Sequence, residues 1–451
     1  MKLTVFQSGK GDCMLLTGAD SRHLLADGGV GNAYSEHVAP ALGKLRDNGE
    51  SLEVVYLSHI DDDHIGGILQ LMNDEVAWRI HDFQVKNGNP HHKEPDAPRP
   101  PKVKAIWHNA FHELLKDNTG AIEDMLAASA AILSGSEHEA VKQLASEQSE
   151  LVTSIAQSIK LTRRVGAEQL GIKLNVPAKG KLMLVRPSTT AAIKLGGVRL
   201  RIIGPFSEDL VTLRKEWNDW LRDNQEQLKT IKAQAKKDES SFGAKEIDDI
   251  MLPKIAQAEQ LAELLPLDQL ATVAFKLGDR KKVTTPNLAS LMFFVEEAGK
   301  TLLLTGDGHH LDIVRGLKHL KKLNGAKKGI HLDVLKVQHH GSENNLDEGF
   351  CRTVTADNYV FCGNGEHENP DERVLQAIID SRLGTATTLS ANPEVGNSFK
   401  FWFNSHATVT TKAAAKEHLK KVEKLVDKAV NKSNGKMSSF FLKGQSFDLA
   451  I

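Results

Sequence analysis

The sequence predicts an α/β fold in which several strands end in residues that can bind metal. Short apolar runs typical of buried strands recur along the chain and alternate with helical stretches. Four of these runs are followed closely by histidine or aspartate residues. Because the ends of neighbouring strands meet at one edge of a sheet, we expect these polar side chains to gather at a single site.

The first 75 residues have the pattern of a sheet core. Glycine-rich turns separate short apolar runs, and one helical stretch is expected at 35–47. The predicted strands are residues 3–6, 13–17, 23–26 and 54–57. Residues 76–100 are rich in proline and are predicted to be irregular.

Two helical blocks are expected to interrupt the sheet core. Residues 110–170 are rich in Ala, Leu, Glu and Gln, and a second block with many charged residues covers about 207–265. Strands are predicted between these blocks at 182–185 and 198–203. Because no internal repeat is visible, we expect one catalytic domain over residues 1–451, with helical insertions at 76–180 and 207–270.

The last third of the chain is predicted to continue the sheet core. Strand-like runs between 272 and 405 alternate with helices expected at 309–322 and 370–381. A basic helix at 411–432 and a short strand at 438–442 complete the chain.

Composition excludes some classes of protein. The chain has 451 residues, 40 % of them hydrophobic, so it can bury a sizeable core. A formal net charge of −1 argues against an overall electrostatic attraction to nucleic acid, although a chain with this net charge can still carry local basic patches.

The three cysteines are far apart and odd in number, which favours a reducing compartment. The N-terminus enters a strand pattern directly and the apolar runs are too short to cross a bilayer, so we expect a soluble cytoplasmic protein.

The strongest chemical signal follows the strand predicted at 54–57. Residues 58–67 read SHIDDDHIGG and place four potential metal ligands within six residues, namely His59, Asp61, Asp63 and His64. Ligands that leave one strand end together can converge on a point without long-range alignment. The two glycines that follow are expected to let the chain turn sharply.

Three later strands end in residues of the same kind. The apolar run at 301–304 is followed by Asp307, the run at 332–337 by His339 and His340, and the run at 359–362 by His367. Carboxylates and imidazoles at four strand ends favour one shared metal or proton-transfer site.

These motifs resemble metallo-β-lactamase-fold hydrolases, and most closely the hydrolase domain of ComEC-type DNA-uptake proteins. The family opening GQGDxxLL is matched by residues 9–16, its Asp-Gly-Gly by 27–29 and its metal loop SHxDxDHxGG by 58–67. The family segments LLTGD and LKVxHHGS are matched by 303–307 and 335–342, and a later Gly-His segment is matched less well by His367 and Pro370. The helical blocks lie outside the resemblance. The chain also lacks a membrane channel, so DNA transport does not follow.

The resemblance implies an αββα sandwich with two divalent metal ions at the sheet edge. His59 and Asp61 would hold one metal, Asp63 and His64 the other, and Asp307 would bridge them because a carboxylate has two oxygens. His340, which precedes Gly341, is expected to be the last ligand, and His339 is the alternative.

Two departures from the general fold pattern bear on the choice of metal. Asp61 takes the place of the second histidine in HxHxDH, and Asn287 takes the place of the histidine usually found before the LLTGD strand. Both changes exchange imidazole for oxygen, which favours manganese or magnesium at the first position and leaves zinc open.

Several other residues have two interpretations. Asp12 and Asp27 lie next to turn glycines, where a carboxylate orients the metal loop more often than it takes part in catalysis. His108 would face the substrate or lie in the first insertion. His367 would transfer a proton or bind substrate, or serve only in a turn.

Two groups of lysines suggest local basic patches. The predicted helix 411–432 carries a stripe, and a second group lies near the presumed active-site strands. The residues are Lys412, Lys416, Lys420, Lys421, Lys424 and Lys428 in the stripe, and Lys318, Lys321, Lys322, Lys327 and Lys328 in the second group. Such stripes can follow phosphates, although solvated helix faces are more common, particularly with Glu417 and Glu423 interspersed.

The function that follows is hydrolysis by a water molecule that two metals activate, with Asp63, Asp307 and His367 as catalytic residues. The resemblance favours phosphodiester substrates, either nucleic acid or a small nucleotide. Two alternatives stay open: a lactone, amide or thioester hydrolase, and a protein whose helical blocks bind a partner. If the insertions cap the site, single-stranded ends or small nucleotides should be preferred over duplex.

Overall fold

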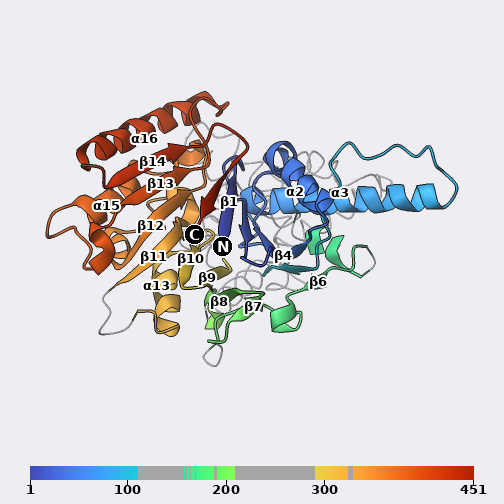
Figure 1. The fold of residues 1–451 in the computed structure, drawn as a ribbon, viewed down its shortest axis with the longest axis horizontal. Helices are drawn as coiled ribbons and strands as arrows, with labels where there is room; N and C mark the ends of the chain where they lie inside the picture. The colour runs from blue at the N-terminus through green and yellow to red at the C-terminus, as the bar shows by residue number, and fades with distance from the viewer. Residues whose placement is uncertain are drawn as a thin grey trace, which may run out of the picture.

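Two β-sheets pack face to face and helices cover both outer faces (Figure 1). The computed structural model describes residues 1–109, 157, 160–162, 164–167, 169–186, 190–208, 290–323 and 329–451. Within these residues the layers run helix, sheet, sheet, helix, so the predicted αββα sandwich is confirmed.

The first sheet has seven strands in the order β15-β1-β2-β3-β4-β5-β6. Its strands are β1 (Lys2–Phe6), β2 (Met14–Thr17), β3 (His23–Ala26), β4 (Leu52–Tyr56), β5 (Ala105–Trp107), β6 (Lys173–Leu174) and β15 (Ser446–Ala450). Strands β3 to β6 are parallel to one another. The helices on its outer side are α1 (Gly31–Ala33), η1 (Tyr34–Val38), α2 (Ala39–Asp47) and α3 (Asp62–Lys86).

The second sheet has eight strands in the order β14-β13-β12-β11-β10-β9-β8-β7. Its strands are β7 (Ile193–Leu195), β8 (Val198–Gly204), β9 (Met292–Glu297), β10 (Lys300–Leu304), β11 (Ile330–Lys336), β12 (Val354–Phe361), β13 (Phe399–Phe403) and β14 (Met437–Phe441). Strands β10 to β14 are parallel. The longer helices of this half are α13 (His310–His319), α14 (Glu348–Thr353), α15 (Glu372–Leu383) and α16 (Ala413–Lys432).

Alternation along each strand divides the core into three layers. In β12, Tyr359 and Phe361 pack under the helices of the second sheet, whereas Val360 lies between the sheets. In β2 and β3, Leu16 and Leu24 lie between the sheets. Because side chains point alternately to the two faces, strands buried on both faces consist almost entirely of apolar residues. This explains why short apolar runs identified most strands.

The first helical insertion is smaller than the range 76–180 predicted for it. Residues 76–86, expected to be irregular, belong to α3, and β5 pairs with β4 in the first sheet. The chain therefore returns to the sheet before residue 110, and β6 adds a further strand after the block. Most of the predicted helical residues, 110–156 and 209–289, lie outside the described residues, as does Asn287.

The C-terminal segment crosses from the second sheet to the first. After β14, which matches the strand expected at 438–442, β15 pairs antiparallel with β1 and brings the two chain ends close together (Figure 1). Strand β15 was not predicted from the sequence. None of the described helices has the length and apolar character needed to span a membrane.

Candidate metal centre

The polar residues at the strand ends lie at one edge of the sandwich. Asp27 follows β3 and the segment 58–64 follows β4, which runs parallel to β3. Asp307 follows β10 and the histidine pair follows β11, again in parallel strands. The expectation that separate strand ends share one edge is therefore confirmed within each sheet, and ion-pair contacts join the two sheets there.

Asp307 lies at the centre of this edge and is buried. Its Oδ1 is 3.5 Å from His64 Nε2, and its Oδ2 is 3.3 Å from His340 Nε2. The same Oδ2 lies 3.7 Å from His59 Nε2 and 3.8 Å from His339 Nε2. Four imidazoles thus surround one carboxylate.

Two more carboxylates of the metal loop complete the cluster. Asp63 Oδ2 is 3.1 Å from His340 Nε2 and 4.0 Å from His64 Nε2. Asp61 Oδ2 is 3.4 Å from His59 Nε2 and is the most exposed member, at 36 %. The structure therefore brings together all seven residues predicted as metal ligands, including both His339 and His340.

Each of the four imidazoles makes a hydrogen-bond contact through its Nδ1 atom. His64 Nδ1 is 3.0 Å from Asp27 Oδ2, and His59 Nδ1 is 3.0 Å from Ser58 Oγ. His340 Nδ1 is 2.6 Å from the Cys362 carbonyl oxygen, and His339 Nδ1 is 2.6 Å from an oxygen on the side chain of Asn345. An N–H at Nδ1 that donates to these oxygens leaves Nε2 of each ring facing the cluster, where it can bind a cation once it carries no proton.

Within the part of the chain that the structure describes, several buried atoms of the cluster have no hydrogen-bond partner. They are Nε2 of His59, His64 and His340, and Oδ1 of Asp307. Each such atom costs about 1–3 kcal/mol when it is left unsatisfied. Imidazole nitrogens and carboxylate oxygens are also the donors that divalent cations take in proteins. The residues present therefore fit a divalent metal.

Asp27 holds the metal loop in place. It accepts hydrogen bonds from the Ser58 amide and the Ser58 hydroxyl, both at 2.7 Å, in addition to its contact with His64. These contacts agree with the orienting role predicted for Asp27.

The glycines of the metal loop do not form the sharp turn that we predicted. Gly66 and Gly67 lie inside α3, which begins at Asp62. A Cβ on Gly67 would lie 2.0 Å from the Gly28 carbonyl oxygen. The glycines instead let α3 pack against the loop after β3, where Gly67 donates to the Gly29 carbonyl at 2.9 Å.

The histidine pair has an unusual backbone. His339, His340 and Gly341 have φ values of 46°, 55° and 90°, so three successive residues are in the left-handed region. Residues other than glycine rarely adopt this conformation, and strain of this kind is concentrated at functional sites. Here it accompanies two adjacent imidazoles that both face Asp307.

A buried ion pair beneath the cluster was not predicted. Lys336 and Asp12 are both fully buried and pair with each other. Lys336 also donates to the Gly306 carbonyl at 2.9 Å and lies 3.7 Å from Asp307 Oδ1. Asp12 Oδ1 is 3.2 Å from His340 Nδ1, and Asp12 forms a group of potential ligands with His64, Asp307 and His340, whose donor atoms all lie within 4.8 Å of one another.

Charge within the cluster shifts several pKa values. Burial lowers the pKa of His64 and His340, but the neighbouring carboxylates, Asp307 first, outweigh burial and raise both well above the usual value. Burial raises the pKa of Asp307, but the imidazoles, His340 first, hold it well below the usual value. For Lys336, the charges of Asp12 and Asp307 outweigh burial and raise the pKa.

We expect metal binding to release protons. Because the pKa values of His64 and His340 are raised in the metal-free protein, both rings are protonated near neutral pH, and a cation that takes Nε2 must displace about one to two protons. Affinity should therefore rise with pH up to the raised pKa values. Calorimetric titration at one pH in two buffers of different ionisation enthalpy measures the protons released. A binding enthalpy that is the same in both buffers would contradict this expectation.

His367 and His108 lie apart from the described contacts of the cluster. His367 is exposed in η6 (Glu366–Glu368), and in the described part of the chain its ring makes no hydrogen bond or ion pair. His108 is buried just after β5, and its amide donates to Asn175 Oδ1 at 2.9 Å. The catalytic role of His367 stays a prediction.

Comparison with known families agrees with this geometry. Residues 8–127 match the family model described as metallo-beta-lactamase superfamily, a range that contains Asp12, Asp27 and the whole metal loop. Comparison with curated proteins gave no match. Members of this superfamily are generally hydrolytic and typically bind divalent metals, often zinc. The αββα sandwich and the cluster around Asp307 agree with the match of residues 8–127 to the metallo-beta-lactamase superfamily, and the cluster is a candidate divalent-metal site.

Proposed function

We propose that the protein is a phosphodiesterase or nuclease that works through a two-metal centre. The observation that carries the proposal is the position of Asp307, whose Oδ1 faces His64 while its Oδ2 faces His59 and His339. A carboxylate placed in this way would give one oxygen to each of two cations.

The contacts suggest how the ligands divide between two positions. His59, Asp61 and His339 would serve the first position, since His59 contacts Asp61 and His339 approaches the same oxygen of Asp307 as His59. His339 would then supply the imidazole that Asn287 does not.

The remaining ligands form the second position. Asp63, His64 and His340 would serve it, since Asp63 contacts both rings. In this division His339 and His340 are both ligands, one at each position.

The chain's own groups prepare this site for hydrolysis. Divalent cations, when bound, supply Lewis acidity that makes a water molecule more acidic and neutralises negative charge on substrate oxygens. Asp27, Ser58 and the Cys362 carbonyl fix the ring orientations, and Lys336 contacts both the Gly306 carbonyl and Asp307. Asp61 and His339 are the more exposed ligands, so substrate would approach from their side.

Two considerations favour phosphodiesters as substrates. Asp61 adds an oxygen ligand where the general fold pattern has imidazole, and oxygen ligands favour harder cations that suit phosphate oxygens. The motifs also resemble the hydrolase domain of DNA-uptake proteins. The second candidate is a lactone, amide or thioester hydrolase, because the superfamily match does not distinguish substrates.

We expect manganese to support faster phosphodiester hydrolysis than zinc. The test strips the protein with a chelator, restores each cation separately, and measures turnover of bis(p-nitrophenyl) phosphate, cyclic nucleotides, matched single- and double-stranded oligonucleotides, and lactones. Faster turnover with zinc would contradict the oxygen-ligand argument. Lactone hydrolysis without phosphodiester turnover would establish the second candidate.

The same oligonucleotides test the proposed cap. If the insertions narrow the entrance to the metal centre, the protein should cleave the single-stranded oligonucleotide faster than the duplex. A preference for long duplex would contradict the proposal that the insertions cap the site. The predicted cap itself lies mostly outside the described residues.

A further inference from the structure

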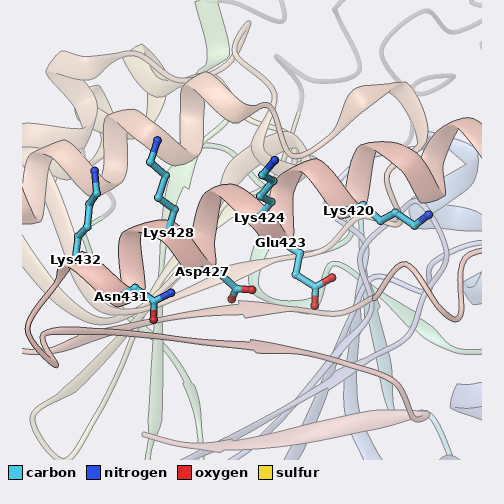
Figure 2. Close-up of a pocket in the computed structure, with 7 residues that line it drawn as sticks. All are labelled: Lys420, Glu423, Lys424, Asp427, Lys428, Asn431 and Lys432. Atoms are coloured by element: carbon cyan, nitrogen blue, oxygen red, sulfur yellow. The ribbon is translucent and has the colours of Figure 1, made fainter.

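Helix α16 presents a row of lysines on the outer surface of the second sheet's helical layer. The lysine row consists of Lys421, Lys424, Lys428 and Lys432. Spacings of three and four residues place these side chains on one face of the helix, with a rise of about 4.5–6 Å between successive members. Figure 2 shows Lys424, Lys428 and Lys432 extending from one side of the helix, and Glu423 and Asp427 from the other.

Among the described residues, no ion pair neutralises the charges of the lysine row. All four side chains are exposed, and within the described residues none of them lies within ion-pair distance of a carboxylate. By contrast, two lysines nearer the start of the helix are paired: Lys412 contacts Glu366 at 2.5 Å, and Lys420 contacts Glu417 at 2.7 Å. The row therefore keeps its positive charge.

The lysine row forms one wall of a groove of about 610 Å³ between α15 and α16. The floor is aliphatic, and the opposite wall carries Glu372, Gln376 and Asp380. Asp380 accepts a hydrogen bond from Gln376 at 2.8 Å. Four lysines against two carboxylates leave the groove with an excess of positive charge. The floor residues are Ile379, Leu383, Leu425 and Ala429.

Both helices that form the groove begin near the edge that carries the metal cluster. The amide of Asp371, the residue before α15, donates to the Gly341 carbonyl at 3.0 Å. The first turns of α16 pack on the loop at Gly365, where a Cβ would lie 2.3 Å from the Ala415 carbonyl oxygen. From that edge the groove runs outward along the helical layer.

We propose that this groove binds the sugar–phosphate backbone of a single-stranded nucleic acid and guides it toward the metal edge, an inference that rests on the phosphodiesterase function proposed above. Evenly spaced cations over several helical turns suit a polymer with evenly spaced anions better than a compact anion, which would contact one or two lysines. Because none of the described residues that line the groove is aromatic, we expect no stacking of bases there, and binding should be independent of sequence.

The test measures binding in the presence of a chelator, so that no cleavage occurs. Fluorescence anisotropy of a labelled single-stranded oligonucleotide compares the wild-type protein with the Lys424→Gln/Lys428→Gln variant. The matched control is Lys44→Gln/Lys86→Gln, which removes two exposed lysines from α2 and α3. We expect the groove variant to bind about tenfold more weakly at low salt, with a slope of log K against log salt smaller by about 1.4. The control should stay within about twofold.

Three outcomes would overturn the groove proposal. The first is equal weakening in both variants, which would indicate only diffuse electrostatic attraction. The second is unchanged binding in the groove variant. The third is a labelled polyglutamate that binds the wild-type protein more tightly than the oligonucleotide and loses that binding in the groove variant, which would assign the groove to an acidic protein partner. Hydrolysis of bis(p-nitrophenyl) phosphate by the wild-type protein reports separately on the proposed function.

Discussion

Asp307→Asn should remove metal from the protein and reduce hydrolysis at least about a thousandfold, because we propose that this carboxylate holds both cations, and their Lewis acidity would supply several kcal/mol of charge stabilisation. The amide keeps the shape of the carboxylate but loses its charge and one acceptor oxygen, while four Nε2 atoms depend on that carboxylate. Metal content by mass spectrometry of the purified variant, turnover of the best phosphodiester substrate and far-UV circular dichroism measure the three consequences. The fold should stay largely intact.

Asp62→Asn is the matched control for this variant. Asp62 lies between two of the predicted ligands, but it accepts a hydrogen bond from Gln157 Nε2 at 2.7 Å and makes no contact with the cluster in the described residues. Its variant should keep both metal and activity. Full metal content and full activity in Asp307→Asn would refute the two-metal assignment.

The candidate metal ligands could be identified from the sequence because most of them lie close together in it. His59, Asp61, Asp63 and His64 lie within six residues after one strand, and parallel strands carry Asp307 and the histidine pair to the same edge. The choice between His339 and His340 could not be predicted. Both residues have a left-handed backbone, and this conformation lets both rings face Asp307. The amino-acid composition of the segment does not show that conformation.

The start of α3 was not predicted, because it lies within the metal loop. Asp61 is the N-cap residue, and Asp62 and Asp63 occupy the first turn, where negative side chains favour a helix. Gly66 and Gly67 are poor helix formers and suggested a turn. Their close contact with the loop at Gly28 outweighs that preference, and only the tertiary structure shows it.

The sequence of β15 has the alternating pattern of a strand, although this strand was not predicted. Its five residues alternate between exposed and buried positions, as expected for a strand with one face on the core. The segment is short and directly follows another predicted strand, so the local pattern alone does not mark it as a separate strand. Its partner β1 lies at the other end of the sequence, and pairing at that distance is not visible in a local pattern.

The buried lysine illustrates the same limit. Lys336 interrupts an apolar strand, which signals that a carboxylate must lie opposite, because an ammonium is almost never buried unless it is paired. The identity of that carboxylate could not be inferred, since Asp12 is far away in the sequence and near only in the folded protein.

Lys336→Met should lower the free energy of unfolding of the metal-free protein by about 3–5 kcal/mol. Methionine fills a similar volume, so the loss comes mainly from leaving Asp12 buried without its cation. Denaturant unfolding in the presence of a chelator, followed by circular dichroism, measures the change. Asp12→Asn should be less damaging, because Lys336 would still have the Gly306 carbonyl and the Asp307 carboxylate nearby.

The double variant Asp12→Asn/Lys336→Met separates the ion pair from the packing around it. Removing both charges leaves neither group unpaired, so the double variant should be more stable than the sum of the two single losses implies.

In Lys336→Met the pKa of Asp12 should rise above its unfolded value. The stability deficit should then be smaller at pH 5 and grow as the pH rises, because a raised carboxyl pKa favours the folded state only while the proton is held. Additive losses within about 0.5 kcal/mol, with no dependence on pH, would mean that Lys336 contributes packing and not charge.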